Sequence, residues 1–69
     1  MNPTIRVNGT LEPLQATSVA ELLRRKAIDP DHKGIAVALN GKVLARHAWA
    51  QTALSPGDAV EIVTAFAGG

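Results

Sequence analysis

Two Asn-Gly pairs, at residues 8–9 and 40–41, constrain the fold of this chain more than any other feature. Asn-Gly is the strongest short signal for a β-hairpin, because a type I′ turn needs positive φ at both of its central residues. Large apolar residues alternate with small or polar ones before each pair, in residues 4–7 and 35–39, with the period of a strand. The sequence therefore predicts two hairpins, one in each half of the chain.

Proline and glycine mark the remaining strands and loops. Pro13 lies in the returning strand of the first hairpin and marks it as an edge strand, because proline cannot donate a ladder hydrogen bond. A short strand at residues 43–44 completes the second hairpin. Residues 46–52 lack strand alternation and predict a loop with a helical turn. The turn Ser55-Pro56-Gly57-Asp58 then leads into a final strand over residues 60–66.

A single helix is predicted between the two hairpins. Ser18 and Glu21 form a capping box, in which the Ser18 hydroxyl accepts the Glu21 amide and the Glu21 carboxylate reaches back. Arg25, four residues after Glu21, adds a favourably oriented ion pair. Asp29-Pro30 is expected to end the helix, because proline disfavours helical geometry in the residue before it. The apolar face of this helix comprises Val19, Leu22, Leu23, Ala27 and Ile28.

The predicted order of elements is β-β-α-β-β-β. This order is typical of a two-layer α+β domain in which one mixed sheet packs on one helix, and the right-handed crossover rule limits how the second half returns. We expect the last strand to lie beside the first, in the middle of the sheet. The predicted core comprises Val19, Leu22, Leu23, Val37, Leu39, Val60 and Ile62.

The composition argues against several classes of function. Seven Lys/Arg against six Asp/Glu give a formal charge of +1, and Trp49 and Phe66 are the only aromatic residues, so a nucleic-acid-binding surface is not expected. The chain has no cysteine, and His32 and His47 alone cannot complete a structural zinc site, so no metal is expected. It shows no signal peptide and no membrane-spanning stretch, so we expect a cytoplasmic domain.

Ala67-Gly68-Gly69 follows the last predicted strand and carries almost no side chain. Glycine lacks Cβ and adopts φ values closed to other residues, so such a tail suits a narrow channel. The one reactive group of this tail is its terminal carboxylate. A terminus that simply frays is the alternative interpretation. We therefore expect a folded domain over residues 1–66 and a flexible tail over residues 67–69.

Several segments together are similar to a known family: residues 18–23, 35–41, 43–49, 54–62 and 67–69. They resemble the ThiS-type sulfur carriers of thiamine biosynthesis, which have the ubiquitin-like β-grasp fold, and the resemblance runs essentially from end to end. The Gly-Asp turn and the terminal Gly-Gly are shared with other ubiquitin-like carriers. Residues 46–49, Arg-His-Ala-Trp, are more particular to ThiS. Ala45 stands where members commonly carry proline, which costs some loop rigidity.

The resemblance implies a carrier protein rather than an enzyme. In this family an adenylyltransferase of the ThiF type uses ATP to adenylate the C-terminal glycine, and a persulfide donor supplies the sulfur of the resulting thiocarboxylate. That thiocarboxylate donates sulfur to the thiazole formed by a ThiG-type synthase. Gly69 would then carry the sulfur, while Gly68, Ala67 and Phe66 would enter the partner's channel. The chain itself is expected to bind no cofactor and to be a monomer when free.

A patch of small apolar residues is predicted on the sheet face away from the helix, at Ala36, Ala38, Val63 and Ala65. Exposed apolar patches mark partner sites, although scattered exposed alanines are ordinary. Phe66 is either a docking contact at the root of the tail or a core residue, and alternation alone does not decide between them. Trp49 is expected to anchor its loop, because indole rings are usually buried.

Three other functions share some of these features. A molybdopterin-type carrier of the MoaD kind would use the same chemistry, but such carriers are usually longer and have a bulkier apolar approach to Gly-Gly. A ubiquitin-like modifier would be joined through Gly69 to lysines of other proteins. A passive β-grasp interaction module would tolerate the loss of Gly68 and Gly69.

Overall fold

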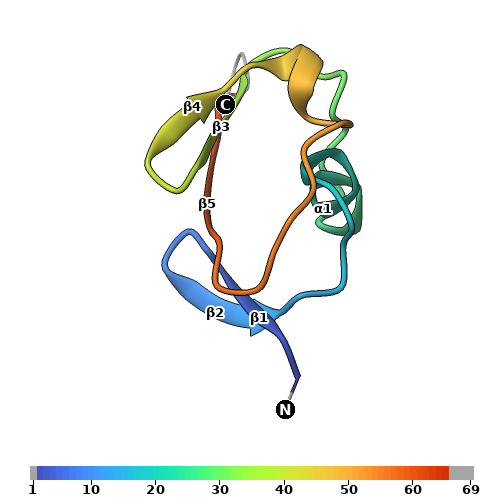
Figure 1. Ribbon diagram of the computed structural model, residues 1–69. Coiled ribbons are helices and arrows are strands. Elements are labelled where there is room, and N and C mark those ends of the chain that lie inside the picture. The colour runs from blue at the N-terminus through green and yellow to red at the C-terminus, as the bar shows by residue number, and fades with distance from the viewer. Residues whose placement is uncertain (1, 66–69) are drawn as a thin grey trace.

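The computed structural model describes residues 2–65 and contains one helix packed against one face of a five-stranded sheet (Figure 1). The expectations for Phe66, Ala67, Gly68 and Gly69 lie outside the described residues. The predicted β-β-α-β-β-β order is confirmed. Its elements are β1 (Thr4–Val7), β2 (Thr10–Pro13), α1 (Val19–Arg25), β3 (Ile35–Leu39), β4 (Lys42–Leu44), the 3-10 helix η1 (Arg46–Ala48) and β5 (Ala59–Thr64).

The strands are arranged in the order β2-β1-β5-β3-β4. β5 is parallel to β1 and antiparallel to β3, while each hairpin pairs its own two strands antiparallel. The last strand therefore lies beside the first in the middle of the sheet, as predicted, and the strand that contains Pro13 lies at an edge. No helix within residues 2–65 is long and apolar enough to cross a membrane.

The predicted turns are confirmed by their backbone angles. Asn8 and Gly9 have φ of 51° and 82°, and Asn40 and Gly41 have φ of 52° and 84°, as type I′ turns require. In the turn at residues 55–58, the Asp58 amide donates to the Ser55 carbonyl at 3.1 Å. The Asp58 carboxylate accepts the Ser55 amide at 2.8 Å. Asp58 therefore has the turn role typical of aspartate.

The start of α1 is confirmed in part. The Ser18 Oγ accepts the Glu21 amide at 3.2 Å, as a capping box requires. The Glu21 carboxylate, however, accepts the backbone amide and the hydroxyl of Thr17 rather than the amide of Ser18. Among residues 2–65 it forms no close ion pair with Arg25, whose charge acts on Glu21 only more weakly than the hydrogen bonds from Thr17. The carboxylate is instead held by the residue that precedes the cap.

The predicted end of α1 was wrong. The helix ends at Arg25, well before Asp29-Pro30. Ala27 has a left-handed φ of 61°, and the Ile28 amide donates back to the Leu23 carbonyl at 2.9 Å. With the bond from the Ala27 amide to the Arg24 carbonyl at 3.0 Å, this forms a Schellman motif, which satisfies the last free carbonyls of a helix. Ala27 is therefore exposed outside the helix, while Ile28 still packs against the core.

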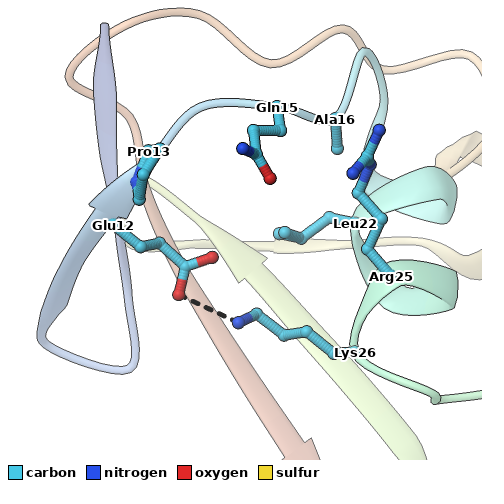
Figure 2. Close-up of a pocket in the computed structure, with 7 residues that line it drawn as sticks. All are labelled: Glu12, Pro13, Gln15, Ala16, Leu22, Arg25 and Lys26. Carbon is cyan, nitrogen blue, oxygen red and sulfur yellow. Dashed lines mark hydrogen bonds and ion pairs between the residues drawn. The ribbon is translucent and has the colours of Figure 1, made fainter. Parts of the chain in front are cut away.

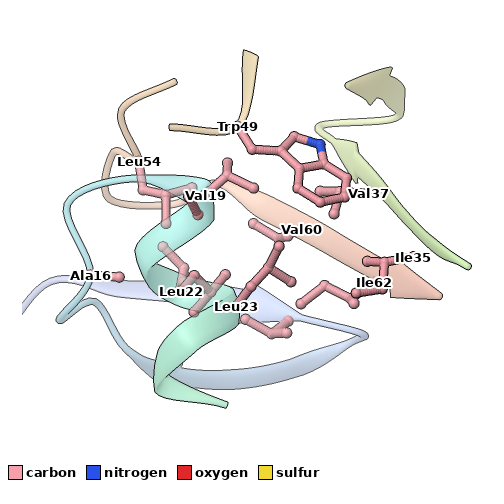
Figure 3. Close-up of a cluster of buried hydrophobic side chains, with 13 residues drawn as sticks. Ala16, Val19, Leu22, Leu23, Ile35, Val37, Trp49, Leu54, Val60 and Ile62 are labelled. Atoms are coloured by element: carbon pink, nitrogen blue, oxygen red, sulfur yellow. The ribbon is translucent and has the colours of Figure 1, made fainter. Parts of the chain in front are cut away.

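The core lies between α1 and the inner face of the sheet (Figure 3). Six of the seven predicted core residues are buried, and the seventh, Leu39, is half-buried against the others. The helix contributes Leu23, which is fully buried, and the sheet contributes alternate residues of three strands. The buried residues are Ile5, Val7, Ala16, Val19, Ala20, Leu22, Leu23, Ile35, Val37, Trp49, Leu54, Val60 and Ile62.

Trp49 anchors its loop as predicted. Its ring is buried, and its Nε1 donates to the Leu44 carbonyl at 3.0 Å. The Arg46 guanidinium lies 4.6 Å from the ring centroid and also donates to the carbonyls of Pro30 and His32. This cation–π contact and these hydrogen bonds join η1 to the loop that leads into β3. The absence of proline at residue 45 is thus accompanied by several contacts that hold the segment.

Candidate functional site

The carboxyl end of β5 is held against β3 up to the last described residue. Thr64 lies opposite Ile35, and the Ala65 amide donates to the Gly34 carbonyl at 2.7 Å. Phe66 and then the predicted tail, residues 67–69, follow in the sequence. The part of the chain that precedes these residues is therefore hydrogen-bonded, through Ala65, to the residue before β3.

The other side of β5 is paired over a shorter length. β1 pairs only with Ala59 and Val60, and the chain then turns away at Asn8. The Asn8 side chain continues the pairing, because its Oδ1 accepts the Ile62 amide at 2.7 Å and its Nδ2 donates to the Ile62 carbonyl at 3.2 Å. β5 thus extends beyond β1 toward the root of the tail.

The outer face of the sheet carries the predicted apolar patch. The core side chains lie on the face of the sheet that α1 covers (Figure 3), so the residues that alternate with them along the strands belong to the outer face. Ala36 lies opposite Val63, which is 60% exposed, and Ala65 is also exposed. Ala38 is half-buried and lies opposite Glu61. The structure therefore brings Ala36 and Val63 together directly, with Ala38 and Ala65 on either side of them along the strands.

The outer face also contains residues that the sequence reasoning missed. Val43 is 85% exposed and lies opposite Ala38, and Leu11 is 57% exposed and lies opposite Arg6. Glu61 adds a negative charge to the same face. The alternation in residues 4–7 could have placed Arg6 there, because Ile5 and Val7 point to the core. The face is therefore apolar at several points, with a positive charge at Arg6 on β1 and a negative charge at Glu61 on β5.

A shallow hollow of about 590 Å³ lies on the β1 side of this patch. Its lining includes Arg6, Asn8, Glu61 and Val63. The hollow occurs where β1 has ended and β5 continues, so it follows from the unequal lengths of the two parallel strands. It extends the outer face from the predicted patch toward the first hairpin.

A second hollow, of about 210 Å³, lies between the end of β2 and α1 (Figure 2). Lys26 and Glu12 form an ion pair of 2.9 Å beside it, and Leu22 lies between the helix and this opening. Small-molecule sites usually measure about 300–1,000 Å³, so this opening is small for one. The ion pair joins α1 to the edge of the first hairpin, which is a structural role.

Titratable groups offer little further chemistry in the part of the chain that the structure describes. Hydrogen bonds from Thr17, from its backbone amide first and its hydroxyl second, lower the pKa of Glu21 below its ordinary value of 4.5. This carboxylate lies at the start of α1, away from the outer face. His32 lies in the loop before β3 and His47 lies in η1, and residues 2–65 contain no cluster of three or more His, Cys, Asp or Glu that could hold a metal ion.

Known proteins with similar sequences and structures place the chain in a family. The model of the ThiS family matches residues 3–69. A crystal structure of the thiamine biosynthesis protein ThiS from Geobacter metallireducens is 33% identical, with a TM-score of 0.77 over 96% of this chain and 99% of that one. A solution structure of a thiamine biosynthesis protein from the same organism is 36% identical, with a TM-score of 0.73 over 100% and 88%. No curated protein matches. The β-grasp arrangement, the end-to-end family match and both structural similarities show that this chain belongs to the ThiS family, the sulfur carriers of thiamine biosynthesis.

Proposed function

We propose that the Gly69 carboxylate is adenylated by a ThiF-type enzyme and then converted to a thiocarboxylate. The thiocarboxylate would donate its sulfur to the thiazole of thiamine on a ThiG-type synthase. The observation that carries this proposal is the match to the ThiS family over residues 3–69, which includes Gly68 and Gly69. The absence of cysteine agrees with it, because no side-chain thiol is available to carry the sulfur instead.

The chemistry requires activation of a poor electrophile. The carboxylate oxygen attacks the α-phosphorus of ATP, pyrophosphate leaves, and a mixed anhydride with AMP forms. The terminal sulfur of a persulfide then attacks the carbonyl carbon and displaces AMP. A thiol reduces the resulting acyl disulfide to the thiocarboxylate. The anhydride must be kept from water until the sulfur attacks, which is a general role of closed sites, and a tail of small residues can enter such a site.

Docking of the partner enzymes is proposed on the outer face, around Ala36 and Val63. This face is not covered by α1, it exposes apolar side chains, and it lies beside Ala65 at the root of the tail. Exposed apolar area of this kind is typical of interaction sites. A partner that binds there would receive residues 66–69 from the adjoining end of β5. Phe66 and Ala67 would then be the first contacts inside its channel.

Reconstitution of the sulfur transfer tests this function. The protein is incubated with a ThiF-type enzyme, ATP and a persulfide, and its intact mass is measured. We expect the mass to rise by the difference between one sulfur and one oxygen atom, and fragmentation to locate the change at Gly69. Deletion of Gly69 should abolish the change while leaving the melting temperature nearly unaltered. Gly68→Val should impair it, because a β-branched side chain widens and stiffens the tail.

Two outcomes would contradict the proposal. Normal sulfur incorporation by the variant that lacks Gly69 would show that the terminus is not the carrier. Sulfur found on a side chain would show the same. Stable conjugates between Gly69 and lysines of other proteins would instead support the modifier function.

A further inference from the structure

The backbones of Gly34 and Ala65 lie so close together that a side chain at residue 34 would collide with Ala65. Gly34 precedes β3 and has a φ of +86°, and its carbonyl accepts the Ala65 amide. A Cβ built on Gly34 would lie inside 3.0 Å of the Ala65 carbonyl oxygen and 3.2 Å from the Ala65 carbonyl carbon. Both atoms belong to the backbone, so neither can turn aside as a flexible side chain would.

From this contact we infer that Gly34 is a positioning residue for the sulfur-carrying tail. The absence of a Cβ at residue 34 lets the backbone of Ala65 lie directly against the start of β3. The backbone of Ala65, the last described residue, is therefore held at a defined point beside the outer face. This inference rests on the proposed function, since it concerns where Gly69 is delivered.

The length of the tail makes that point of departure important. Four residues separate Ala65 from the carboxylate of Gly69, and a fully extended chain of four residues spans at most about 14 Å. A partner that uses most of this reach leaves little slack to absorb a displaced root. A misplacement of about 1 Å at a reacting group can lower a rate by about 100-fold. A shift of Ala65 would thus affect the reaction at Gly69 without altering the tail itself.

Gly34 differs from the other described glycines in this respect. Gly9, Gly41 and Gly57 also have positive φ, but a Cβ built on any of them meets no atom within 4 Å. Gly57 is the closest match, with a φ of +85°. Gly57→Ala therefore introduces the same left-handed alanine as Gly34→Ala, without crowding any backbone. The pair of variants separates backbone strain from displacement of Ala65.

The test compares wild type, Gly34→Ala and Gly57→Ala as substrates of a ThiF-type enzyme. The rate of adenylation is measured from the pyrophosphate released, at a temperature well below all three melting transitions. We expect both variants to lose melting temperature, but only Gly34→Ala to lose kcat, by about 10- to 100-fold. Its KM should change little, because the outer face is kept. The NMR amide signal of Ala65 should shift in Gly34→Ala and stay in place in Gly57→Ala.

A second variant covers the case in which Gly34→Ala does not fold. Ala65→Pro leaves Gly34 unchanged and removes the amide that donates to the Gly34 carbonyl. This variant should also lower kcat, with a smaller change in KM. Unchanged kcat in Gly34→Ala or in Ala65→Pro would overturn the inference, as would a rise in KM alone. If wild type and Gly57→Ala are both adenylated by the ThiF-type enzyme, the proposed function stands whatever the result for Gly34→Ala and Ala65→Pro. Failure of wild type to be adenylated would instead refute the function.

Discussion

The side-chain amide of Asn8 forms two hydrogen bonds with the backbone of Ile62, a residue 54 positions later in the chain. Because β1 ends at Val7, this amide takes the place of the next residue of the strand. Asn40 contacts β5 from the other hairpin, where its Oδ1 accepts the Ala59 amide at 2.9 Å. Each hairpin asparagine therefore supplies the positive φ of its turn and also binds the central strand.

Asn8→Gly should destabilise the fold while leaving the turn intact. Glycine adopts the positive φ at no steric cost, so the substitution removes the side-chain bonds to β5 and adds only the greater flexibility of glycine in the unfolded chain, which Asn40→Gly shares. We expect the free energy of unfolding to fall by about 1–3 kcal/mol, because the partly buried amide of Ile62 loses its acceptor. Urea denaturation measures this change. Asn40→Gly is the matched control and should cost less, since its bonds are exposed to water.

Equal stability of Asn8→Gly and wild type would show that water replaces the asparagine without cost. A larger loss in Asn40→Gly than in Asn8→Gly would contradict the assignment as well. In that case the second hairpin, rather than the first, would provide the stronger side-chain bond to β5.

Ala27→Gly should stabilise the protein. Ala27 occupies the left-handed position of the Schellman motif, which costs an alanine about 1–2 kcal/mol relative to its usual conformation. Glycine removes this cost but raises the conformational entropy of the unfolded chain, which offsets part of the gain. We therefore expect the free energy of unfolding to rise by about 1 kcal/mol. A gain of that size raises the melting temperature by about 4–8 °C in a domain of this length. Calorimetry or thermal circular dichroism measures the shift.

Ala20→Gly is the control for this substitution. Ala20 is buried inside α1, where glycine costs about 1 kcal/mol of helix propensity. The same chemical change should therefore have opposite signs at the two positions. A loss of stability in Ala27→Gly would mean that the positive φ at this residue carries no strain.

The two ends of α1 show what the sequence reveals and what it conceals. Its start is predictable, because Ser18 and Glu21 have the residue types and the spacing of a capping box. Its end is not, because the left-handed position carries alanine where glycine is the usual signal. The Asp29-Pro30 pair was the nearest recognisable stop, yet tertiary contacts of Ile28 with the core end the helix earlier.

The candidate site was predictable to a similar extent. Alternation along two strands placed Ala36 and Val63 on the outer face, and the order of elements with the right-handed crossover rule led us to expect the last strand in the centre of the sheet. The contact between Gly34 and Ala65 was not predictable, because it joins residues 31 positions apart across two strands. The hydrogen bonds of Asn8 to Ile62 were missed for the same reason. Local patterns do not specify which distant backbone a side chain will meet.

Glu21 should make stability depend on pH in the acid range. Hydrogen bonds from Thr17 lower the pKa of Glu21 in the folded protein below 4.5. The stabilisation from this group is therefore complete above its unfolded pKa and is lost as the pH falls through the folded pKa. We expect the free energy of unfolding of wild type to exceed that of Glu21→Gln near neutral pH, and the two to converge in acid. Urea denaturation over the acid range measures this difference.

An NMR titration of the Glu21 carboxyl carbon gives the independent measurement. Thr17→Ala removes the hydroxyl but keeps the backbone amide, so it should raise the pKa of Glu21 only part of the way to its ordinary value. A difference between wild type and Glu21→Gln that is unchanged across the acid range would contradict this account.

Val63→Asp should weaken binding to the adenylyltransferase without unfolding the carrier. Val63 is 60% exposed and lies opposite Ala36 at the centre of the proposed docking patch. A charge placed there would be buried unpaired in the complex, so we expect a loss of about 1–2 kcal/mol in binding free energy, as for a central interface residue. Isothermal calorimetry with a ThiF-type enzyme measures the dissociation constant, and a thermal melt confirms that the free protein remains folded.

Val43→Asp is the matched control, since Val43 is 85% exposed on the same face but lies on the edge strand β4. Its effect on binding should be smaller than that of Val63→Asp, because it is further from the root of the tail at Ala65. Unchanged affinity in Val63→Asp would remove the outer face from the docking proposal. A larger effect of Val43→Asp than of Val63→Asp would place the centre of the docking surface on the second hairpin rather than on β5. A partner bound there would lie further from Ala65, from which the tail must reach it.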